Sequence, residues 1–415
     1  PVRVPECAGL QSIDVYENLG LVGKGAFNKI YKAKHRKTGE IVALKAMQLD
    51  ALGPSGTATE EGLPLEMMRE MGILMSLRHP NIIKVHEVVV DDLQMFMVME
   101  LVDFDLGLLI EHMRQPFAQQ QVKCLTMQLL SALAAVHENF VLHRDLKQTN
   151  LLLDKGGVLK LCDFGLARRA APGRACTPNV TSLWYRAPEI LLGVKAYTSG
   201  VDMWSTGCIV AEWLQLGEPL MQGTGEMDQI NTIFRLLGTQ SDASWPGFSS
   251  LPSIATGLVQ PIESGALQTM TLGPDGSVIK LPRSSLRKKL PAEGYTPAYP
   301  GNYRTTALAE SGFELLSSLL CCDPARRRTA KDALASPWFT EDPLPVPLSR
   351  GEIRQLRRGR DEAINSGAHT AAIAQQRAAT AAKVAGEHAA QVAHSIRERL
   401  QSSGLLGLPS RGAGF

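Results

Sequence analysis

The sequence predicts an α+β protein with two unequal lobes: a small antiparallel-sheet lobe with one main helix, and a larger, mainly helical lobe. Up to about residue 101 the chain shows the alternating pattern of strands. Beyond about residue 103, apolar side chains recur at helical spacing instead. Gly23 and Gly25 lie between the first two strand patterns. A strand follows them, whereas a dinucleotide-binding fold would continue into a helix.

The first lobe, at about 16–101, follows a lead-in at 1–15. Its strand patterns occupy 19–22, 29–34, 41–45, 82–90 and 95–101. Thr38-Gly39 predicts a turn between the second and third strands, and the polar residues 51–62 predict a loop. Pro64 then opens a helical pattern with four apolar residues on one side: Met67, Met71, Leu74 and Met75.

The second lobe extends over about 103–340. Helical patterns occupy 118–139, 202–216, 226–238, 311–321 and 329–335. Residues 249–305 are rich in Gly, Pro, Ser and Thr and have few long apolar runs. They predict a long surface insertion, with a hairpin across Leu272–Leu281 around Pro274-Asp275-Gly276.

The last part of the chain, 341–415, differs in composition from both lobes. It begins with a Pro-rich linker at 343–347. Residues 351–400 are rich in Ala, Gln and Arg, with good helix propensity but few residues to bury. This composition predicts a solvated helical or partly disordered tail, and the alternative is a docking helix for a partner.

Composition excludes several classes of function. Lys plus Arg number 43 and Asp plus Glu 41, so a net charge of +2 gives no reason to expect nucleic acid or an anionic membrane as a direct partner. No apolar run reaches the roughly 18 residues that span a bilayer. The seven cysteines show no CxxC metal spacing and predict reduced thiols. The chain starts at Pro1 instead of Met, and N-terminal sequence can be missing.

Two features of the first lobe suit nucleotide phosphates. Glycines such as Gly23 and Gly25 let backbone N–H groups approach phosphates closely, although an ordinary hairpin turn would also use them. Lys45 ends an apolar strand and needs a partner, because an unpaired buried charge is costly. Glu70 on the following helix is the expected partner, and the alternative is a surface lysine on an edge strand.

The segment from His143 to Asn150, followed by Asp163-Phe164-Gly165, carries the residue types that phosphoryl transfer needs. Asp145 can accept the proton of an attacking hydroxyl, and Lys147 can neutralise charge on the transferred group. Asn150 and Asp163 supply oxygen ligands for Mg²⁺ held against ATP phosphates. Simple turn carboxylates are the alternative for Asp145 and Asp163, but each lies within a longer matching motif.

Ala187-Pro188-Glu189 follows these motifs along the chain. Glu189 is expected to form an ion pair with Arg327, which would attach this segment to the helical lobe. That role is architectural. The histidines at 79, 86, 112 and 137 are expected to be structural, because Asp145 already takes the part of the base.

With these motifs in place, residues from about 16 to 340 resemble a eukaryotic Ser/Thr protein kinase, and more narrowly a cyclin-dependent kinase. The narrower resemblance rests on Thr181–Glu189, Asp163–Arg168 and Val201–Cys208. Residues 61–64, leading to Arg69-Glu70, are similar to the PITSLRE/PISSLRE branch. The resemblance implies the bilobal protein-kinase fold.

The resemblance also implies an ATP- and Mg²⁺-dependent Ser/Thr kinase that is proline-directed and activated by a cyclin. Its substrates would be proteins with Ser/Thr-Pro sites, in cell-cycle or transcription and RNA-processing control, in the nucleus and/or cytoplasm. The alternative is a pseudokinase or scaffold that only presents surfaces. Which cyclin and which substrates are involved stays open at this point.

Two further sets of residues follow from the resemblance. The backbone of Glu100 and Val102 would bind adenine, with Met99 at the back of the pocket and apolar surface from Val22, Ile30, Ala43 and Leu153. Thr177 would accept an activating phosphate, held by Arg69, Arg144 and Arg168. The alternative is that these arginines pair with surface carboxylates.

The sequence departs from the family pattern at several positions. Ala26-Phe27 stands where relatives often carry a phosphorylated Thr-Tyr pair, so that inhibitory control is expected to be absent. Asn28 replaces the third glycine of the loop. In the catalytic segment, Gln148-Thr149 replaces the usual Pro-Gln or Pro-Glu pair.

Overall fold

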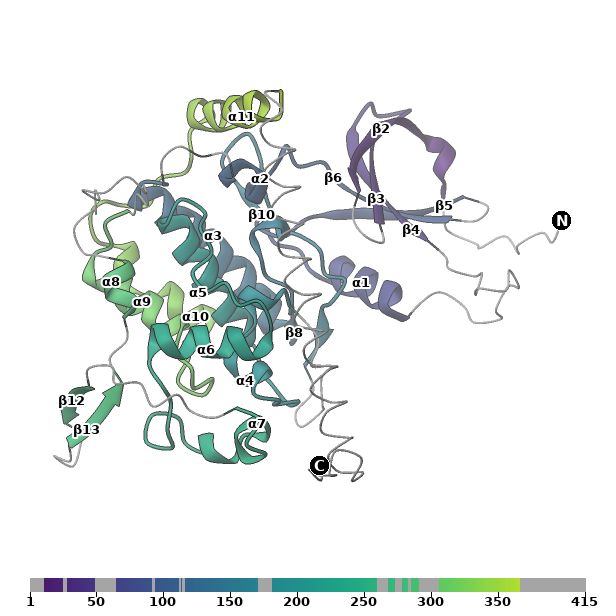
Figure 1. The fold of residues 1–415 in the computed structure, drawn as a ribbon. Helices are drawn as coiled ribbons and strands as arrows, with labels where there is room; N and C mark the ends of the chain where they lie inside the picture. The colour runs from purple at the N-terminus through teal and green to yellow at the C-terminus, as the bar shows by residue number, and fades with distance from the viewer. Residues whose placement is uncertain are drawn as a thin grey trace, which may run out of the picture.

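The computed structural model describes most of the chain between residues 11 and 365. The described ranges are 11–24, 28–48, 65–91, 94–111, 113, 116–170, 181–259, 268–272, 278–282, 285–290 and 306–365. Figure 1 shows a sheet with one helix on the right and a helical body on the left. The α+β, two-lobed expectation is therefore confirmed.

A six-stranded sheet forms the small lobe. Its strands are β1 (Gln11–Ser12), β2 (Tyr16–Lys24), β3 (Asn28–His35), β4 (Ile41–Gln48), β5 (Val85–Asp91) and β6 (Gln94–Glu100), in the order β1-β5-β6-β4-β3-β2. All neighbours are antiparallel except β1, which pairs with β5 in parallel. The expected antiparallel sheet is therefore present, and two lead-in residues extend its edge with one short parallel strand.

The helix α1 (Leu65–Ser76) is the one main helix of this lobe. Met71 and Leu74 are buried, as the helical spacing predicts. Met75, at the end of the same apolar pattern, is 54% exposed. The lobe therefore covers only part of the apolar side of α1, and the part that includes Met75 is open to solvent.

The large lobe is built from helices. These are α2 (Leu106–Ile110), α3 (Gln119–Glu138), α4 (Pro188–Leu191), α5 (Gly200–Leu214), α6 (Glu226–Leu237), α7 (Pro252–Ala255), α8 (Leu286–Lys289), α9 (Glu310–Leu319) and α10 (Ala330–Leu334). Short 3-10 turns of this lobe occur at η2 (Gln148–Asn150), η3 (Leu183–Tyr185), η4 (Phe248–Ser250) and η5 (Pro337–Phe339), and η1 (Ile13–Val15) lies in the small lobe. The five helices predicted for this lobe are all present, with boundaries shifted by a few residues.

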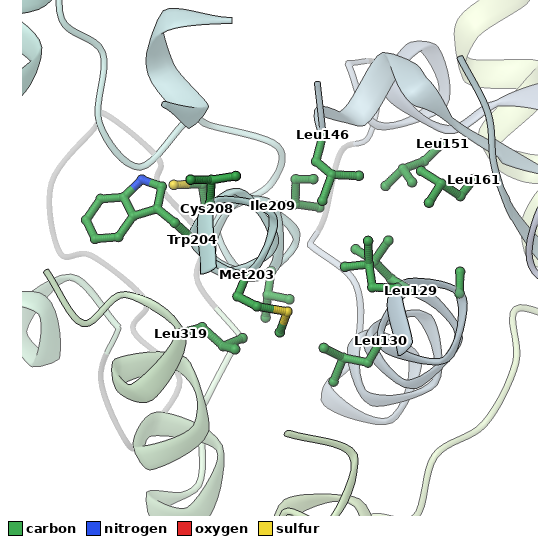
Figure 2. Close-up of a cluster of buried hydrophobic side chains, with 14 of the residues drawn as sticks. Leu129, Leu130, Leu146, Leu151, Leu161, Met203, Trp204, Cys208, Ile209 and Leu319 are labelled. Atoms are coloured by element: carbon green, nitrogen blue, oxygen red, sulfur yellow. The ribbon is translucent and has the colours of Figure 1, made fainter. Parts of the chain in front are cut away.

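The core of this lobe lies where α3 meets α5. All residues of α5 are buried. In Figure 2, Leu129 and Leu130 of α3 face Met203 and Ile209 of α5 across this seam. Leu146, which comes just after the predicted base, packs into the same cluster. Burial of one such side chain stabilises by about 1.5–3 kcal/mol, so this cluster anchors the loop that carries the chemistry.

Short strands position the segments on either side of that loop. They are β7 (Phe104–Asp105), β8 (Val141–Leu142), β9 (Leu151–Leu153), β10 (Leu159–Leu161) and β11 (Arg168–Arg169). The order β10-β9-β7 ties the segment after the loop to the end of the first lobe, and β8 pairs with β11. The loop between β8 and β9 is thus clamped at both ends.

The structure describes three parts of the predicted surface insertion, 249–305: residues 249–259, a hairpin and a short helix. A hairpin is present here, as predicted, and it pairs β12 (Gln268–Leu272) with β13 (Val278–Pro282), with Leu272 opposite Val278. The turn itself lies outside the described residues. Leu286 and Leu290 are buried in the core of the lobe, so α8 is anchored there and is not a surface element.

The described part of the tail packs on the large lobe. Helix α11 (Arg350–Asn365) buries Ile353, and Gln121 Nε2 donates to Glu352 Oε1 at 2.6 Å. Upstream, Lys123 Nζ donates to the Glu341 carbonyl at 2.7 Å. The linker and α11 therefore form a strap on the large lobe, with hydrogen bonds to α3 and with α11 packed against α2. Within the described part of the chain, no helix is both long enough and apolar enough to cross a membrane.

Candidate active site

A buried lysine lies at the junction of the two lobes. Lys45 belongs to β4, which is paired on both sides by β3 and β6. Its Nζ lies 2.6 Å from Glu70 Oε1 of α1 and 3.6 Å from Asp163 Oδ1. Burial works to lower the pKa of Lys45, but the two carboxylates outweigh it and raise that pKa. The lysine is therefore a fixed positive charge, and the expected contact with Glu70 is present.

The strand β2 pairs with β3, which in turn pairs with the strand that carries Lys45. Gly23 lies opposite Ile30, where an added Cβ would meet Ile30 at an ordinary 3.6 Å. Packing alone therefore does not require glycine at this position. Val22 is 54% exposed. Gly25 lies outside the described residues.

The predicted adenine-binding residues lie where β6 leaves the sheet. Ala43 is opposite Met99 in the register of β4 and β6, and both are buried. Leu153 of β9 is buried, and Val102 is partly buried against the same core. Glu100 Oε1 accepts hydrogen bonds from Lys160 Nζ at 2.9 Å and from the Lys84 N–H at 2.8 Å. Because protein groups occupy this carboxylate, a ligand would meet the backbone here instead.

The candidate base lies in the loop between β8 and β9. Asp145 Oδ2 accepts a hydrogen bond from Lys147 Nζ at 2.8 Å and from Asn150 Nδ2 at 3.1 Å. Asn150 Nδ2 also donates to the Asp145 carbonyl at 2.7 Å. Both side-chain contacts fall on Oδ2, which leaves Oδ1 to accept a proton. The structure thus brings together the three predicted catalytic side chains.

Asp163 follows β10 and faces the same space. Its backbone has φ +60°, a left-handed conformation that is uncommon for residues other than glycine. The chain therefore changes direction at Asp163, just after the strand. Burial works to raise the pKa of Asp163, but Lys45 and other positive groups hold it below its usual range. The Asn150 amide uses its nitrogen for hydrogen bonds to Asp145, so its oxygen can serve as a ligand. This oxygen and the charged Asp163 carboxylate are the hard donors that Mg²⁺ prefers.

Two buried aromatic rings join the loop to this carboxylate. His143 and Phe164 have ring centroids 4.7 Å apart in an edge-to-face arrangement. His143 Nε2 also lies 3.1 Å from the Cys162 carbonyl. The residues that flank the two predicted motifs therefore pack on each other and keep the motifs in register.

Asp202 is a site residue that sequence reasoning missed. This buried carboxylate of α5 accepts hydrogen bonds from the His143 N–H at 2.9 Å and from the Arg144 N–H at 2.8 Å. Arg144 has φ +66°, and such a strained backbone persists only when its surroundings hold it. His137 Nε2 lies 2.9 Å from the same carboxylate. An acid among the mainly apolar residues of a buried helix was the available signal.

The expected architectural ion pair is also present. Arg327 Nη1 lies 2.8 Å from Glu189 Oε1, and Arg327 Nη2 lies 3.0 Å from Glu189 Oε2. Burial works to lower the pKa of Arg327, but Glu189 outweighs it and raises that pKa. The pair joins α4 to the segment before α10, which is 138 residues away along the chain.

The three predicted phosphate-binding arginines occupy different surroundings. Arg69 and Arg168 line one open groove of about 340 Å³, together with Met68, Gly72, Ile73 and Arg169. Arg144 donates instead to the Leu166 carbonyl at 2.8 Å and to the Tyr197 hydroxyl at 3.0 Å. Thr177 lies outside the described residues.

The bilobal fold, the buried Lys45–Glu70 pair and the clustered catalytic side chains define a protein kinase. Residues 16–339 match the family described as the protein kinase domain, and the chain belongs to that family. Within it, the chain belongs to the cyclin-dependent kinases. It is 40% identical to cyclin-dependent kinase 11B of Rattus norvegicus over 352 residues, which cover 84% of this chain and 71% of that protein.

Plant kinases are similar to the same extent. Identity to cyclin-dependent kinase G-2 of Oryza sativa subsp. japonica is 43% over 83% of this chain and 45% of that protein. Identity to cyclin-dependent kinase G1 of Arabidopsis thaliana is 42% over 81% of this chain and 51% of that protein. The chain thus spans about half the length of these plant relatives. The expected resemblance to the PITSLRE branch is confirmed.

Proposed function

We propose that this chain is an ATP- and Mg²⁺-dependent Ser/Thr protein kinase that is activated by a cyclin and directed to Ser/Thr-Pro sites. The convergence of Lys45, Asp145 and Asp163 carries the proposal. They come from β4, from the loop after β8 and from the segment after β10. Positioning and charge neutralisation supply most of the catalysis in phosphoryl transfer, and this set of charges is suited to both.

Asp145 is proposed to orient the acceptor hydroxyl and to take its proton. Lys147 and Asn150 hold Oδ2, so the carboxylate presents Oδ1 in a fixed direction. Lys147 Nζ, 2.8 Å from Asp145, brings a positive charge next to the acceptor. That charge can stabilise negative charge on the transferred group as it develops.

Lys45 is proposed to hold the nucleotide phosphates, with Glu70 keeping its ammonium in place. Mg²⁺–ATP supplies the phosphoryl group and the cation that balances its charge. Asp163 and Asn150 would hold the metal, and the positive charge of Lys45 keeps Asp163 ionised for that purpose. Ala43, Met99 and Leu153 provide buried apolar surface for the adenine ring.

The proposed dependence on a cyclin is supported by the names of the relatives and by the surface of α1. Met68 is 47% exposed and Met75 is 54% exposed on the helix that carries Glu70. A partner that covers them would act directly on the element that positions Lys45. Protein substrates, a place in cell-cycle or transcription and RNA-processing control, and a nuclear and/or cytoplasmic location belong to the same proposal.

Thr177 is proposed to be the activating phosphorylation site. Arg69 and Arg168 come from α1 and β11 and line a shared groove. A phosphate carries about 1.5–2 negative charges at neutral pH and could bridge these arginines. Such a bridge would couple the helix of the small lobe to the segment that follows Asp163.

A pseudokinase or scaffold is the competing function. It would need no ordered set of acid, base and phosphate-binding groups, so the intact set of Lys45, Asp145 and Asp163 favours catalysis. The strap that α11 forms on the large lobe is the feature that a scaffold could share with an enzyme.

Phosphoryl transfer by the assembled complex tests the proposal. A tag on this chain would recover it from cells with its bound cyclin. Labelled ATP would then be offered with a Ser-Pro peptide and with a matched Ser-Ala peptide. We expect Mg²⁺-dependent labelling of the Ser-Pro peptide, little labelling of the control, and none with Asp145→Asn. Equal labelling by the wild-type and Asp145→Asn complexes would overturn the proposal.

A further inference from the structure

Gln148 stands directly after Lys147, yet its side chain turns away from the reacting groups. Its Nε2 donates a hydrogen bond to Glu212 Oε2 on α5. Gln148 is 8% exposed and Glu212 is 1% exposed, so the contact is closed to solvent. The catalytic loop therefore has a polar connection to α5 besides the one that Asp202 makes.

Glu212 has a second partner, in the segment that precedes α4. The Tyr185 hydroxyl donates to Glu212 Oε2 at 3.2 Å. Burial raises the pKa of Glu212 to about 8, while its hydrogen bonds with Gln148 and Tyr185 work in the opposite direction. No Lys or Arg of the described residues pairs with it. The acid thus holds a proton at neutral pH, and it joins Gln148 to Tyr185 by hydrogen bonds, without an ion pair.

Tyr185 ends η3, a turn held beside the candidate base. The Thr181 hydroxyl donates at 2.5 Å to the carbonyl of Arg144, the residue before Asp145. Ser205 Oγ of α5 donates to the Tyr185 carbonyl at 2.8 Å. Residues 181–185 therefore lie directly against the loop that carries Asp145.

The buried amide of Gln148 is only half satisfied. Its Oε1 is buried and has no hydrogen-bond partner among the described residues. An unpaired buried acceptor costs stability, so a leucine of similar size would serve the fold at least as well. Polar groups kept at such a cost occur at functional sites more often than in purely structural cores.

We propose that Gln148 is a positioning residue that ties the catalytic loop, through Glu212 and Tyr185, to the segment 181–185 on which the acceptor peptide rests. The proposal deepens the kinase function above and rests on it. The proline usual at this place in the resembling kinases has neither the amide that reaches Glu212 nor a backbone N–H. This connection is thus a property of this chain's own loop.

The test compares Gln148→Leu with wild type in the tag-purified cyclin complex. Loss of one buried hydrogen bond predicts a roughly three- to tenfold rise in KM for the Ser-Pro peptide, with KM for ATP unchanged. The midpoint of thermal unfolding should stay within about 3 °C of wild type, a change that corresponds to a small stability effect. Gln11→Leu, the same change at an exposed strand residue, is the matched control and should alter neither KM.

An exchange of the two side chains supplies a rescue. Gln148→Glu combined with Glu212→Gln keeps one acid and one amide in contact, and it should restore the peptide KM to within about twofold of wild type. Gln148→Glu alone places two acids together and should raise that KM. Rescue is not expected if each side chain only fills space.

Hydrogen exchange gives a readout that does not depend on turnover. In Gln148→Leu, the amides of 181–185 should exchange faster, while those of α3 keep the wild-type rate. Unchanged exchange at 181–185, or a peptide KM equal to wild type, would overturn the proposal. A wild-type complex that labels no peptide would instead refute the kinase function, and exchange would still decide whether Gln148 couples the two segments.

Discussion

Lys45 and Glu70, 25 residues apart in the sequence, meet at 2.6 Å between the sheet and the helix of the small lobe. The contact joins β4 to α1, so a displacement of α1 away from the sheet would break it. Because Lys45 Nζ is also 3.6 Å from Asp163 Oδ1, the same ammonium links both lobes. The position of α1 therefore controls the charge arrangement of the whole site.

Replacing Glu70 should leave the protein folded but poorly active. In Glu70→Gln, the neutral amide holds the ammonium less firmly, and Asp163 then competes for it. We expect turnover to fall by about 10²-fold, the range seen when one preorganised charge interaction is lost. Steady-state transfer to the Ser-Pro peptide measures this. Glu17→Gln, at an exposed position of β2, is the control, and equal rates for the two variants would contradict the role of Glu70.

Removal of the candidate base should act on turnover more than on binding. The Asp145→Asn side chain has the same size as the original but cannot accept a proton, so we expect kcat to fall by about 10²–10⁴-fold. The affinity for ATP should change little, because Asp145 does not contact Lys45. Peptide labelling and calorimetric titration of Mg²⁺–ATP check the two parts separately. A variant with wild-type kcat and intact folding would disprove the assignment.

The phosphate switch makes a separate prediction. Thr177→Ala should lower kcat of the cyclin complex, because a phosphate no longer joins Arg69 to Arg168. Arg69→Gln and Arg168→Gln should each lower kcat to a similar extent. When either is combined with Thr177→Ala, kcat should fall no further than in Thr177→Ala alone. Phosphatase-treated wild type is the control. If Thr177→Ala equals the fully phosphorylated enzyme in rate, Thr177 is not the switch.

The buried pair of Glu189 and Arg327 should contribute strongly to stability. Arg327→Met leaves the Glu189 carboxylate buried without its bidentate partner, so the free energy of unfolding should fall by about 3–5 kcal/mol. Glu189→Leu combined with Arg327→Met removes both charges and should recover part of that loss. Urea unfolding followed by circular dichroism measures both variants. Arg326→Met, one residue away, should have a much smaller effect.

The protonation of Glu212 should make stability depend on pH. The pKa of Glu212 rises from 4.5 to about 8 on folding, so the folded state binds more protons than the unfolded chain between those values. Its contribution to stability is therefore full below about pH 4.5 and falls by up to about 1.4 kcal/mol per pH unit as pH approaches 8. Glu212→Gln should remove this decline. Identical slopes for the two proteins between pH 6 and 8 would contradict it.

Much of the fold followed from short-range patterns. Strand alternation placed β2, β3 and β4, and helical spacing placed α3, α5 and α6, because each pattern reflects one buried face of one element. The hairpin of β12 and β13 was predicted from its turn residues. The parallel β1 and the exposed Met75 could not be predicted, since they depend on which distant surface lies opposite.

The candidate site divides in the same way. Asp145, Lys147 and Asn150 lie within six residues, so the sequence by itself determined that their side chains could act together. Spacing along the chain sets the geometry of a single loop. The apolar strand around Lys45 also indicated a carboxylate partner for it, because a buried charge needs an opposite one.

Only the tertiary structure decided which buried side chains of α5 hold the loop that carries Asp145. Asp202 and Glu212 are, respectively, 58 residues from Arg144 and 64 residues from Gln148, and nothing local connects them. The direction of the Gln148 side chain and the docking of α11 on the large lobe likewise depend on how helices pack. Packing joins segments that are remote in the chain, and a buried polar group finds its partner only after those segments have met.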